Sequence, residues 1–494
     1  MDPRMHGGPA RRSRYDTIVV GSGVGGCVTA ALLAQAGQRV LVLEKNPVAG
    51  GITSSMHKRG FKLDMGSHLV SRGARGPVGR VLRKLELRAP RLLTHRIPVR
   101  SRGMLDLAAP PTRAGLPRVA LEACRTLGLS AREEANLGRM VFQMFTLTPL
   151  ELRAWDRRTL DEFVLQHTDH AGAYFLLSFL ASIFFVLPPW DVSAGEAIRC
   201  LRSLLTDYSL SYVQGGMDAL TGALLDRVGA AGGDLVLSAE VAELRPRNGG
   251  WRVVTRDGDA FEADAVACNV APADLLPLLE TSALPADYVE RVRAVRPSGN
   301  AHQLKLALRR PLVEEGCLVG GVSLGGLTLA DLTIDLMRRT VESIDLGHVA
   351  EPLPIYAPVP TNYDPTLAPD GGQIILASIY GPTRDAPADP PGRWKERALE
   401  AMASVVPGLL DELLFVEFVP IPGLARWMGK SARGAISNAQ VPGQVGRDRL
   451  GVATPLPGLF LCGDGTGGRG IGTEMAASSG VEAAAGILRR RPRP

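Results

Sequence analysis

The stretch VVGSGVGGCVTAALLAQAGQRVLVLEK, from Val19 to Lys45, decides the fold that this sequence predicts. It begins inside a β-branched run, Tyr15–Val20, that ends directly at a glycine. The next segment, Val24–Ala36, is rich in alanine and leucine at helical spacing, and Arg39–Glu44 has the composition of a second buried strand. Together they predict a strand–helix–strand unit of about 30 residues, the building block of a parallel sheet.

Three glycines and one acidic residue of this unit indicate a dinucleotide site. Gly21 permits the tight turn after the strand, Gly23 lets the backbone approach a pyrophosphate, and Gly26 lets the helix pack closely on the strand. The helix N-terminus then attracts the phosphates. Glu44 ends the second strand, where a carboxylate accepts hydrogen bonds from adenosine ribose hydroxyls. On this unit alone, NAD and FAD both remain open.

The composition is that of a globular protein with more than one hydrophobic core. The chain has 494 residues, of which 45% are hydrophobic and 21% charged, with 56 glycines that indicate many tight turns. Its six cysteines lack C-x-x-C spacing, so neither a zinc site nor a disulfide framework is predicted, no metal is expected, and a reducing cytoplasm fits best. The basic residues 1–13 are expected to form a flexible N-terminus without the apolar segment of a signal peptide.

Two further segments resemble those of the flavin amine oxidase and phytoene desaturase superfamily. After Glu44 come the glycine pair Gly50-Gly51 and the segment GFKLDMGSH (Gly60–His68), which resembles the turn that returns to the flavin in that family. The C-terminal segment PGLFLCGDGTGGRGIGTEMAASSGVEAA (Pro457–Ala485) resembles its closing strand, turn and helix. Ile52 stands where the family usually has arginine. The chain is thus similar to FAD-dependent phytoene desaturases and carotenoid isomerases, and the resemblance implies non-covalently bound FAD.

The same resemblance identifies the residues expected to bind FAD. The middle segment Gly233–Leu276 resembles the family's returning strands, with turns at Asn248-Gly249 and Asp257-Gly258 and with Val241 on the adenine. Gly463 and Asp464 would follow the pyrophosphate and ribityl chain. The full set of expected FAD-binding residues is Gly21, Ser22, Gly23, Val24, Gly25, Gly26, Glu44, Lys45, Gly50, Gly51, Ile52, Thr53, Ser67, His68, Val241, Gly463, Asp464, Glu474 and Met475.

The expected fold class is α/β, with a Rossmann-like FAD-binding domain and an inserted α+β substrate domain. The FAD-binding domain is expected to be discontinuous, and its three parts are residues 14–90, 213–285 and 431–490. The substrate domain, which is also expected to associate with a membrane, is predicted to consist of residues 91–212 and 286–430.

The inserts favour an isoprenoid substrate. The segments Asn362–Ser378 and Val405–Ile421 resemble those of isoprenoid desaturases and isomerases. The leading hypothesis is an FAD-dependent oxidoreductase that desaturates a long apolar, phytoene-like carotenoid by hydride transfer to flavin N5. A redox-neutral cis/trans isomerase, a polyene saturase using reduced FAD, a flavin amine oxidase and a non-enzymatic prenyl-lipid escort protein remain alternatives.

His68 and Glu474 are the candidates for catalytic proton transfer. If hydride leaves an unactivated carbon first, the transient cation sheds a neighbouring proton to an imidazole or a carboxylate. The alternative hypotheses are that His68 is a turn residue and that Glu474 contributes only its backbone. The sequence has no G-x-S-x-G or H-E-x-x-H motif, which disfavours hydrolytic and metal-centred chemistry.

A basic segment and an apolar segment predict contact with a membrane surface. Between Arg80 and Arg125 there are eleven Lys/Arg against three Asp/Glu, without a nucleic-acid motif. This favours anionic lipid over nucleic acid, with an ordinary solvated surface as the alternative. The expected location is therefore cytoplasmic, peripheral on the inner face of the membrane, and the oligomeric state stays open.

The apolar segment AGAYFLLSFLASIFFVL (Ala171–Leu187) is uncharged and ends at two prolines. At about 1.5 Å per residue it is shorter than the ~20 residues that a transmembrane helix needs. Three interpretations remain: a buried helix of the substrate domain, a wall of a long apolar tunnel, or a helix that dips into the membrane.

Overall fold

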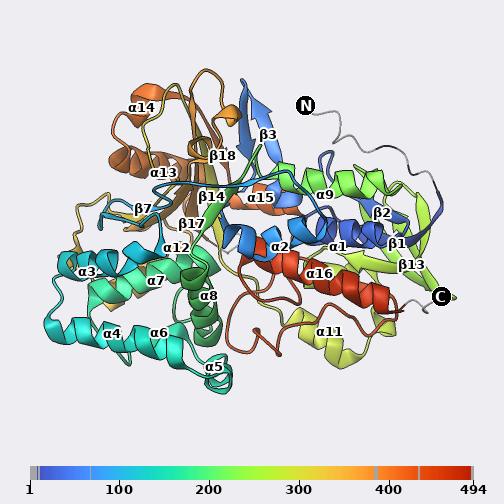
Figure 1. Ribbon diagram of the computed structural model, residues 1–494, viewed down its shortest axis with the longest axis horizontal. Coiled ribbons are helices and arrows are strands. Elements are labelled where there is room, and N and C mark those ends of the chain that lie inside the picture. Colours follow the sequence, from blue (N-terminus) through green and yellow to red (C-terminus); the bar gives the residue numbers. More distant parts are fainter. Residues whose placement is uncertain are drawn as a thin grey trace.

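Two large β-sheets, each with helices of its own, make up the structure (Figure 1). The structure is a computed structural model that describes residues 8, 10, 12–66, 68–382, 388–431 and 434–490. Most of the predicted flexible N-terminus, residues 1–7, 9 and 11, lies outside the described residues. The mixture of parallel and antiparallel sheets with covering helices confirms the predicted α/β class.

The first sheet is mostly parallel and contains the predicted strand–helix–strand unit. Its strands, in spatial order, are β10 (Asp234–Val236), β2 (Val40–Leu43), β1 (Arg14–Val20), β13 (Ala260–Cys268), β12 (Gly250–Thr255) and β11 (Val241–Arg247), with β19 (Leu459–Leu461) paired to the end of β13. Strands β10, β2, β1, β13 and β19 run parallel to one another, whereas β12 is antiparallel to both of its neighbours, β13 and β11. Burial on both faces explains the continuous apolar runs of β2, Val40–Leu43, and of the end of β1, Ile18–Val20.

Alternate residues of these strands face different layers. Val19 and Val42 contribute to the core under α1 (Val24–Gln35), which packs against α9 (Asp218–Ala230) and α16 (Gly472–Arg490) (Figure 1). Ile18 belongs to the core on the opposite face, together with the buried Trp251 of β12. Helices from the beginning, middle and end of the chain therefore cover one face of this sheet.

The elements predicted for this half are confirmed. Strand β1, helix α1 and strand β2 follow one another as the opening stretch predicts. Turns at Asn248-Gly249 and Asp257-Gly258 separate β11, β12 and β13, and both glycines have the positive φ that such turns favour. The C-terminal strand and helix are β19 and α16, joined by a glycine-rich turn.

The second sheet lies in the predicted substrate region and is largely antiparallel. Its strands, in spatial order, are β18 (Leu413–Val419), β14 (Asn300–Leu308), β17 (Gln373–Gly381), β16 (Leu353–Pro358), β15 (Cys317–Val322), β7 (Arg100–Ser101) and β8 (Leu107–Ala108). Leu304 and Leu306 of β14 pack with Trp394 and Met402 of α13 (Pro391–Val405) on one face. The residues that alternate with these leucines, such as Gln303, point to the other face of the sheet because successive strand residues face opposite sides.

A group of helices stands below the second sheet in Figure 1. These helices are α3 (Leu116–Thr126), α4 (Ala131–Thr146), α5 (Pro149–Trp155), α6 (Leu160–Val164), α7 (Ala171–Phe185), α8 (Ala194–Thr206) and α12 (Ile334–Asp345). Three of them begin at capping boxes, in which a serine or threonine and a glutamate exchange hydrogen bonds across the first turn; the pairs are Ser130–Glu133, Thr148–Glu151 and Thr159–Glu162. Helix α7 corresponds to the predicted apolar segment.

Smaller elements connect these layers. The remaining strands form a hairpin, β3 (Ser55–Lys58) and β4 (Phe61–Asp64), and a small sheet, β5 (Val70–Ser71), β9 (Leu210–Val213) and β6 (Leu92–Thr94). The remaining helices are α2 (Pro77–Lys84), α10 (Pro272–Leu275), α11 (Ala286–Arg293), α14 (Leu409–Glu412) and α15 (Ile421–Met428). The small sheet crosses the predicted domain boundaries near residues 90 and 213, and those boundaries remain a prediction. Within the described residues, helices that combine the length and hydropathy needed to cross a bilayer are absent.

His302 is a buried histidine in the core between β14 and α13. Its ring lies 4.9 Å from that of Trp394 and 5.3 Å from that of Phe418, and both of its nitrogens lack a partner in the described structure. Burial lowers its pKa from 6.5 to about 4. The unfolded chain therefore binds a proton between pH 6.5 and 4 that the folded chain excludes, so folding stability falls as the pH falls through this window.

We predict that the substitution His302→Phe makes the protein less sensitive to acid. Its free energy of unfolding, measured by urea titration at several pH values, will fall less between pH 6.5 and 4 than that of the wild type, since an aromatic ring remains and the titrating group is gone. Equal slopes for His302→Phe and the wild type would contradict the prediction.

Candidate cofactor and substrate site

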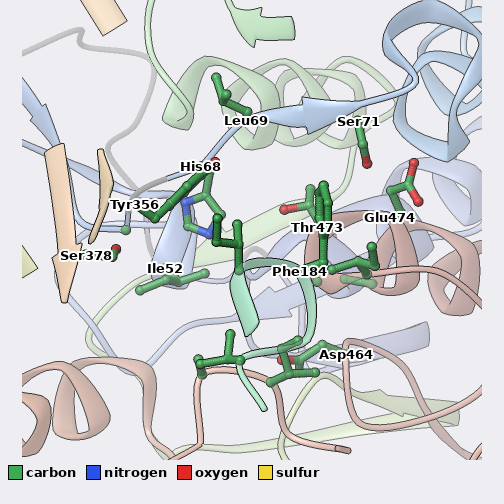
Figure 2. Close-up of a pocket in the computed structure, with 18 of the residues that line it drawn as sticks. Ile52, His68, Leu69, Ser71, Phe184, Tyr356, Ser378, Asp464, Thr473 and Glu474 are labelled. Atoms are coloured by element: carbon green, nitrogen blue, oxygen red, sulfur yellow. The ribbon is translucent and has the colours of Figure 1, made fainter. Parts of the chain in front are cut away.

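One continuous cavity of about 1550 Å³ joins the two sheets. At one end it is lined by the Gly21 turn, Glu44 and Val241 of the first sheet. Its middle part is lined by Ile52, His68, Gly463, Asp464 and Glu474, of which Figure 2 labels all but Gly463. Its far end lies among α3, α4, α7 and α8. The predicted nucleotide motif and the predicted substrate region therefore share one enclosed space.

The glycines of the first turn allow three backbone segments to meet closely. A β-carbon on Gly25 would lie 2.6 Å from Cα of Gly463, and one on Gly26 would collide with the carbonyl oxygen of Gly21. Gly21 itself has a φ of +91°, which side-chain-bearing residues rarely adopt. The start of α1 is thereby held against the C-terminal turn, and its free N–H groups face the cavity, as a pyrophosphate site requires.

Glu44 is oriented before any ligand arrives. One of its carboxylate oxygens accepts hydrogen bonds from the backbone N–H and the hydroxyl of Ser22, at 2.9 and 2.6 Å, and the other accepts the N–H of Asn46 at 2.9 Å. The Ser22 hydroxyl also accepts the N–H of Gly50 at 3.0 Å, which links the two glycine motifs. Each carboxylate oxygen has further acceptor capacity, so Glu44 fits the ribose-binding role predicted from the sequence.

Asp464 lies at the opposite wall of the cavity, and its carboxylate is bound by the protein. It accepts hydrogen bonds from Lys430 Nζ at 3.0 Å and from the hydroxyl and backbone N–H of Ser437 at 2.8 and 3.1 Å. Burial opposes ionisation, but Lys430 and Ser437 together hold the pKa of Asp464 below its usual value. The carboxylate is therefore a fixed negative charge that anchors the C-terminal turn.

Asn269 is a site residue that the sequence reasoning missed. Its amide nitrogen would lie 2.5 Å from a β-carbon on Gly23, and its amide oxygen 2.7 Å from one on Gly463. The residue follows β13, which runs parallel to β1, and ligands of parallel sheets bind at the carboxyl ends of the strands. Its position directly after a predicted buried strand could have indicated Asn269 as a ligand-binding residue. Only the strand pairing, however, shows that β13 lies beside β1.

His68 carries an uncharged imidazole at the cavity wall. Its Nδ1 atom is buried and lacks a partner in the described structure. Burial is the main cause that lowers the pKa of His68 from 6.5 to about 4; a backbone hydrogen bond at Gly66 opposes this shift, and the nearby charge of Lys305 adds to it. Lys305 donates hydrogen bonds to the backbone carbonyls of Asp64 and Met65 and so holds the turn that presents His68. As a weak base, this imidazole is better suited to hydrogen bonding than to accepting a proton near neutral pH.

Glu474 lines the cavity at the start of α16, but its carboxylate is part of an ion pair. Its oxygens lie 2.9 Å from Nε and 3.3 Å from a terminal nitrogen of Arg72. Both side chains are largely buried, so a proton taken up by Glu474 would leave the Arg72 charge without its partner. The pair fixes the segment after β5 to the start of α16, beside Ser71 and Thr473 (Figure 2).

The structure brings most of the predicted cofactor residues to the cavity. Those that line it are Gly21, Gly23, Val24, Gly25, Glu44, Lys45, Gly51, Ile52, Thr53, His68, Val241, Gly463, Asp464 and Glu474. Ser22, Gly26 and Gly50 stand behind this wall and hold it, and Ser67 lies outside the described residues. Met475 is also absent from the lining, because its side chain is buried against Gln440 and Arg449.

The C-terminal turn is also tied to the helical region. Glu196 of α8 is buried, forms an ion pair with Arg469 and accepts the N–H of Gly470. Asp156, at the end of α5, pairs with Arg199 of α8. These contacts couple the wall of the predicted cofactor site to the helices around the far end of the cavity.

We predict that Gly25→Ala will abolish retention of FAD. The added β-carbon must displace the backbone of Gly463, which separates the two turns expected to hold the pyrophosphate. The matched control is Gly138→Ala in α4, where the β-carbon meets no atom within 4 Å and stability should rise by about 0.5–1 kcal/mol. Flavin absorbance of the purified proteins and the increase in melting temperature on adding FAD measure the effect; full flavin content in Gly25→Ala would refute it.

Comparison with known proteins agrees with this arrangement. The family described as flavin containing amine oxidoreductase matches residues 24–488. Pyridine nucleotide-disulfide oxidoreductase domain-containing protein 2 of Mus musculus is 22% identical, with 92% of this chain and 90% of that protein covered. A solved oxidoreductase from Methanosarcina mazei has a TM-score of 0.70 at 20% identity, with 95% of this chain and all of that chain covered, which shows a shared fold.

Two shorter similarities concern proteins that act on polyenes by name. All-trans-retinol 13,14-reductase of Homo sapiens is 45% identical over 69 residues, and phytoene desaturase of Cercospora nicotianae is 50% identical over 62 residues. These matches cover 14% and 13% of this chain but only 11% and 10% of the relatives' own lengths.

The family match spans most of the chain, and the glycine turns, Glu44 and the C-terminal turn line one cavity. The family implies a flavin cofactor, typically FAD, and the oriented acid and the close glycine contacts fit it. The chain belongs to the flavin-containing amine oxidoreductase family.

Proposed function

We propose that this FAD-dependent oxidoreductase binds its FAD non-covalently and acts on a long apolar isoprenoid, most simply by desaturating a phytoene-like carotenoid. The observation that carries this proposal is the far end of the cavity. Its walls there are apolar side chains of four helices, namely Leu116, Val119, Ala123, Met140, Met144, Leu176, Leu177, Phe179, Ile183, Phe184, Leu201, Leu204 and Leu205. Such walls favour a long hydrocarbon over a hydrated ligand.

Helix α7 supports the tunnel interpretation of the apolar segment. Leu177 and Phe184 line the cavity, whereas Tyr174 and Phe185 are buried in the core with residues of α4, α6 and α8. The helix therefore serves both as a core element and as a wall. Its apolar character on all sides follows from these two contacts, without requiring a bilayer.

The charges along the cavity give little support to the amine oxidase alternative. Of the charged residues that line it among the described residues, Glu474 is paired with Arg72 and Asp464 with Lys430. Arg113, just before α3, also lines the cavity and would repel a protonated amine. A cationic substrate would thus enter a largely apolar space without an available carboxylate at its far end.

The chain's own residues bind, orient and shield the reacting carbon. When bound, the flavin supplies the exchange of a hydride with that carbon. The apolar helices hold the polyene and exclude water, the Arg72–Glu474 pair fixes one wall beside the cofactor segment, and the uncharged imidazole of His68 lines the cavity. His68 is a weak base, and the carboxylate of Glu474 is paired with Arg72. We therefore assign proton removal to neither residue.

A product assay tests the reaction. The purified protein, supplied with FAD, liposomes containing phytoene and a quinone as electron acceptor, is expected to yield products with additional double bonds, read by chromatography with absorbance detection. Omitting the quinone should stop turnover after the bound flavin is reduced.

Other results of this assay identify the alternatives. A change from cis to trans that requires pre-reduced FAD would indicate an isomerase, and loss of double bonds a saturase. Turnover of putrescine or benzylamine without any turnover of polyenes would contradict the isoprenoid assignment. Failure to bind flavin at saturating FAD would favour an escort protein.

We further propose that α3 and α4 rest on an anionic membrane surface, with the protein peripheral on the inner face. Large apolar side chains are exposed at this end of the cavity: Leu121, Val141, Phe142, Phe145 and Leu180. Phe142 is 71% exposed, and Val141, Phe145 and Leu180 also line the cavity. Between residues 113 and 139 there are five arginines and three glutamates, so basic groups flank the apolar side chains. A lipid-soluble substrate would enter here without crossing water.

We predict that the double substitution Phe142→Glu/Phe145→Glu weakens vesicle binding at least roughly tenfold, because two aromatic rings no longer insert and two negative charges face the lipid. The measurement is co-sedimentation with phosphatidylcholine vesicles that contain phosphatidylglycerol. Leu410→Glu, which alters another exposed leucine on α14, is the control and should bind as the wild type does. Equal binding of the double variant and the wild type would overturn the assignment of this surface.

A further inference from the structure

A row of side chains crosses the cavity-facing side of the second sheet. Strand pairing places Gln303 opposite Ser378, Ser378 opposite Tyr356, and Tyr356 opposite Val319. Paired residues of neighbouring strands point to the same face. All four line the cavity, so the row forms part of its floor, and three of its four members are polar. This polar row, Gln303–Ser378–Tyr356, lies in a wall to which Ala301, Val319, Pro354 and Ile355 contribute apolar groups.

The turn that carries His68 contacts the polar row. The hydroxyl of Tyr356 accepts the backbone N–H of Leu69, next to His68 in the chain, and Figure 2 labels these residues among those that line the cavity. Ser378 donates to the side-chain oxygen of Gln303 at 3.1 Å. In the described structure Leu69 is the hydrogen-bond partner of the Tyr356 hydroxyl, so its O–H is left available as a donor. The Nδ1 atom of His68 is buried against the Gly66 turn, so Tyr356 is the donor that this side of the cavity offers to a ligand.

Burying unpaired polar groups in an apolar cavity is costly unless a ligand completes their hydrogen bonds. The completing group must be uncharged, because the lining residues contributed by β7 and β14–β17, all within the described part of the chain, include no charged side chain. Lys305 points to the same face but is engaged by the carbonyls of Asp64 and Met65 and is not part of the lining. A carboxylate or an ammonium group would therefore be buried here without a counter-charge.

We propose that the polar row forms a subsite for one neutral oxygen group, a hydroxyl or a carbonyl, on an otherwise apolar substrate. The oxygen of either group can accept a hydrogen bond from the Tyr356 O–H. The inference rests on the proposed isoprenoid function and narrows its substrate class to oxygenated isoprenoids. Ser378 and Gln303 fix the polar side of the floor by their mutual hydrogen bond.

Binding to a matched ligand series tests the subsite. The FAD-loaded protein is titrated with geranylgeraniol, geranylgeranial, geranylgeranylamine and the hydrocarbon of the same skeleton, and the change in flavin absorbance reports occupancy. The alcohol or the aldehyde is expected to bind roughly tenfold more tightly than the hydrocarbon and the amine. In Tyr356→Phe this preference should shrink to about twofold or less, with the hydrocarbon affinity unchanged.

Two controls separate the subsite from a general effect of removing a tyrosine hydroxyl and from a role in holding FAD. Tyr380→Phe makes the same change on β17, two residues from Ser378 on the same face, and should keep the preference. Flavin content must stay at the wild-type level in Tyr356→Phe, because loss of FAD would show that the polar row serves the cofactor and would overturn the proposal.

The remaining outcomes distinguish this inference from the function on which it rests. Isoprenoids that bind without preference for oxygen, or a preference that persists in Tyr356→Phe, would refute the subsite and leave the isoprenoid function standing. Absence of binding by every member of the series, with FAD bound, would refute both.

Discussion

The close approach of α1 to the C-terminal turn is the contact on which the rest of the structure depends. A β-carbon on Gly25 would collide with Gly463, and one on Gly480 of α16 would lie 2.6 Å from the carbonyl oxygen of Gly25. Glycine at these positions lets the first and the last helices pack backbone to backbone. That packing forms the dinucleotide end of the cavity. The substrate-region segments between these two helices in the chain then lie at the carboxyl ends of the parallel strands.

The second half of the cavity depends on a different principle, the alternation of strand residues. In β14, Leu304 and Leu306 enter the core under α13, so the residues that alternate with them point to the opposite face, toward the cavity and the His68 turn. One of these, Lys305, holds the His68 turn, and another, Gln303, belongs to the polar row. The same strand therefore stabilises the fold on one face and shapes the binding space on the other.

Site residues could be predicted from the sequence where they lie close together in the chain, and not where distant segments bring them together. Gly21, Gly23, Gly26 and Glu44 lie within one strand–helix–strand unit, where spacing alone fixes their relation, and the structure places them as expected. Arg72, Asn269, Lys430 and Tyr356 have no such local pattern. Their roles at the cavity or its wall come from contacts between segments that lie up to hundreds of residues apart, such as the contact of Arg72 with Glu474. No repeating pattern in a single sequence predicts such contacts.

The sequence by itself determined the α/β class, the nucleotide unit and the order of the elements, because turns, helical spacing and buried strands are written in neighbouring residues. Only the tertiary structure decided what those elements enclose. The apolar segment Ala171–Leu187, for which the sequence left three interpretations, forms part of the cavity wall. The predicted acid Glu474 is paired with Arg72, and His68 is neutral at the cavity wall. Burial and charge pairing set these properties, and both depend on which distant segments pack together.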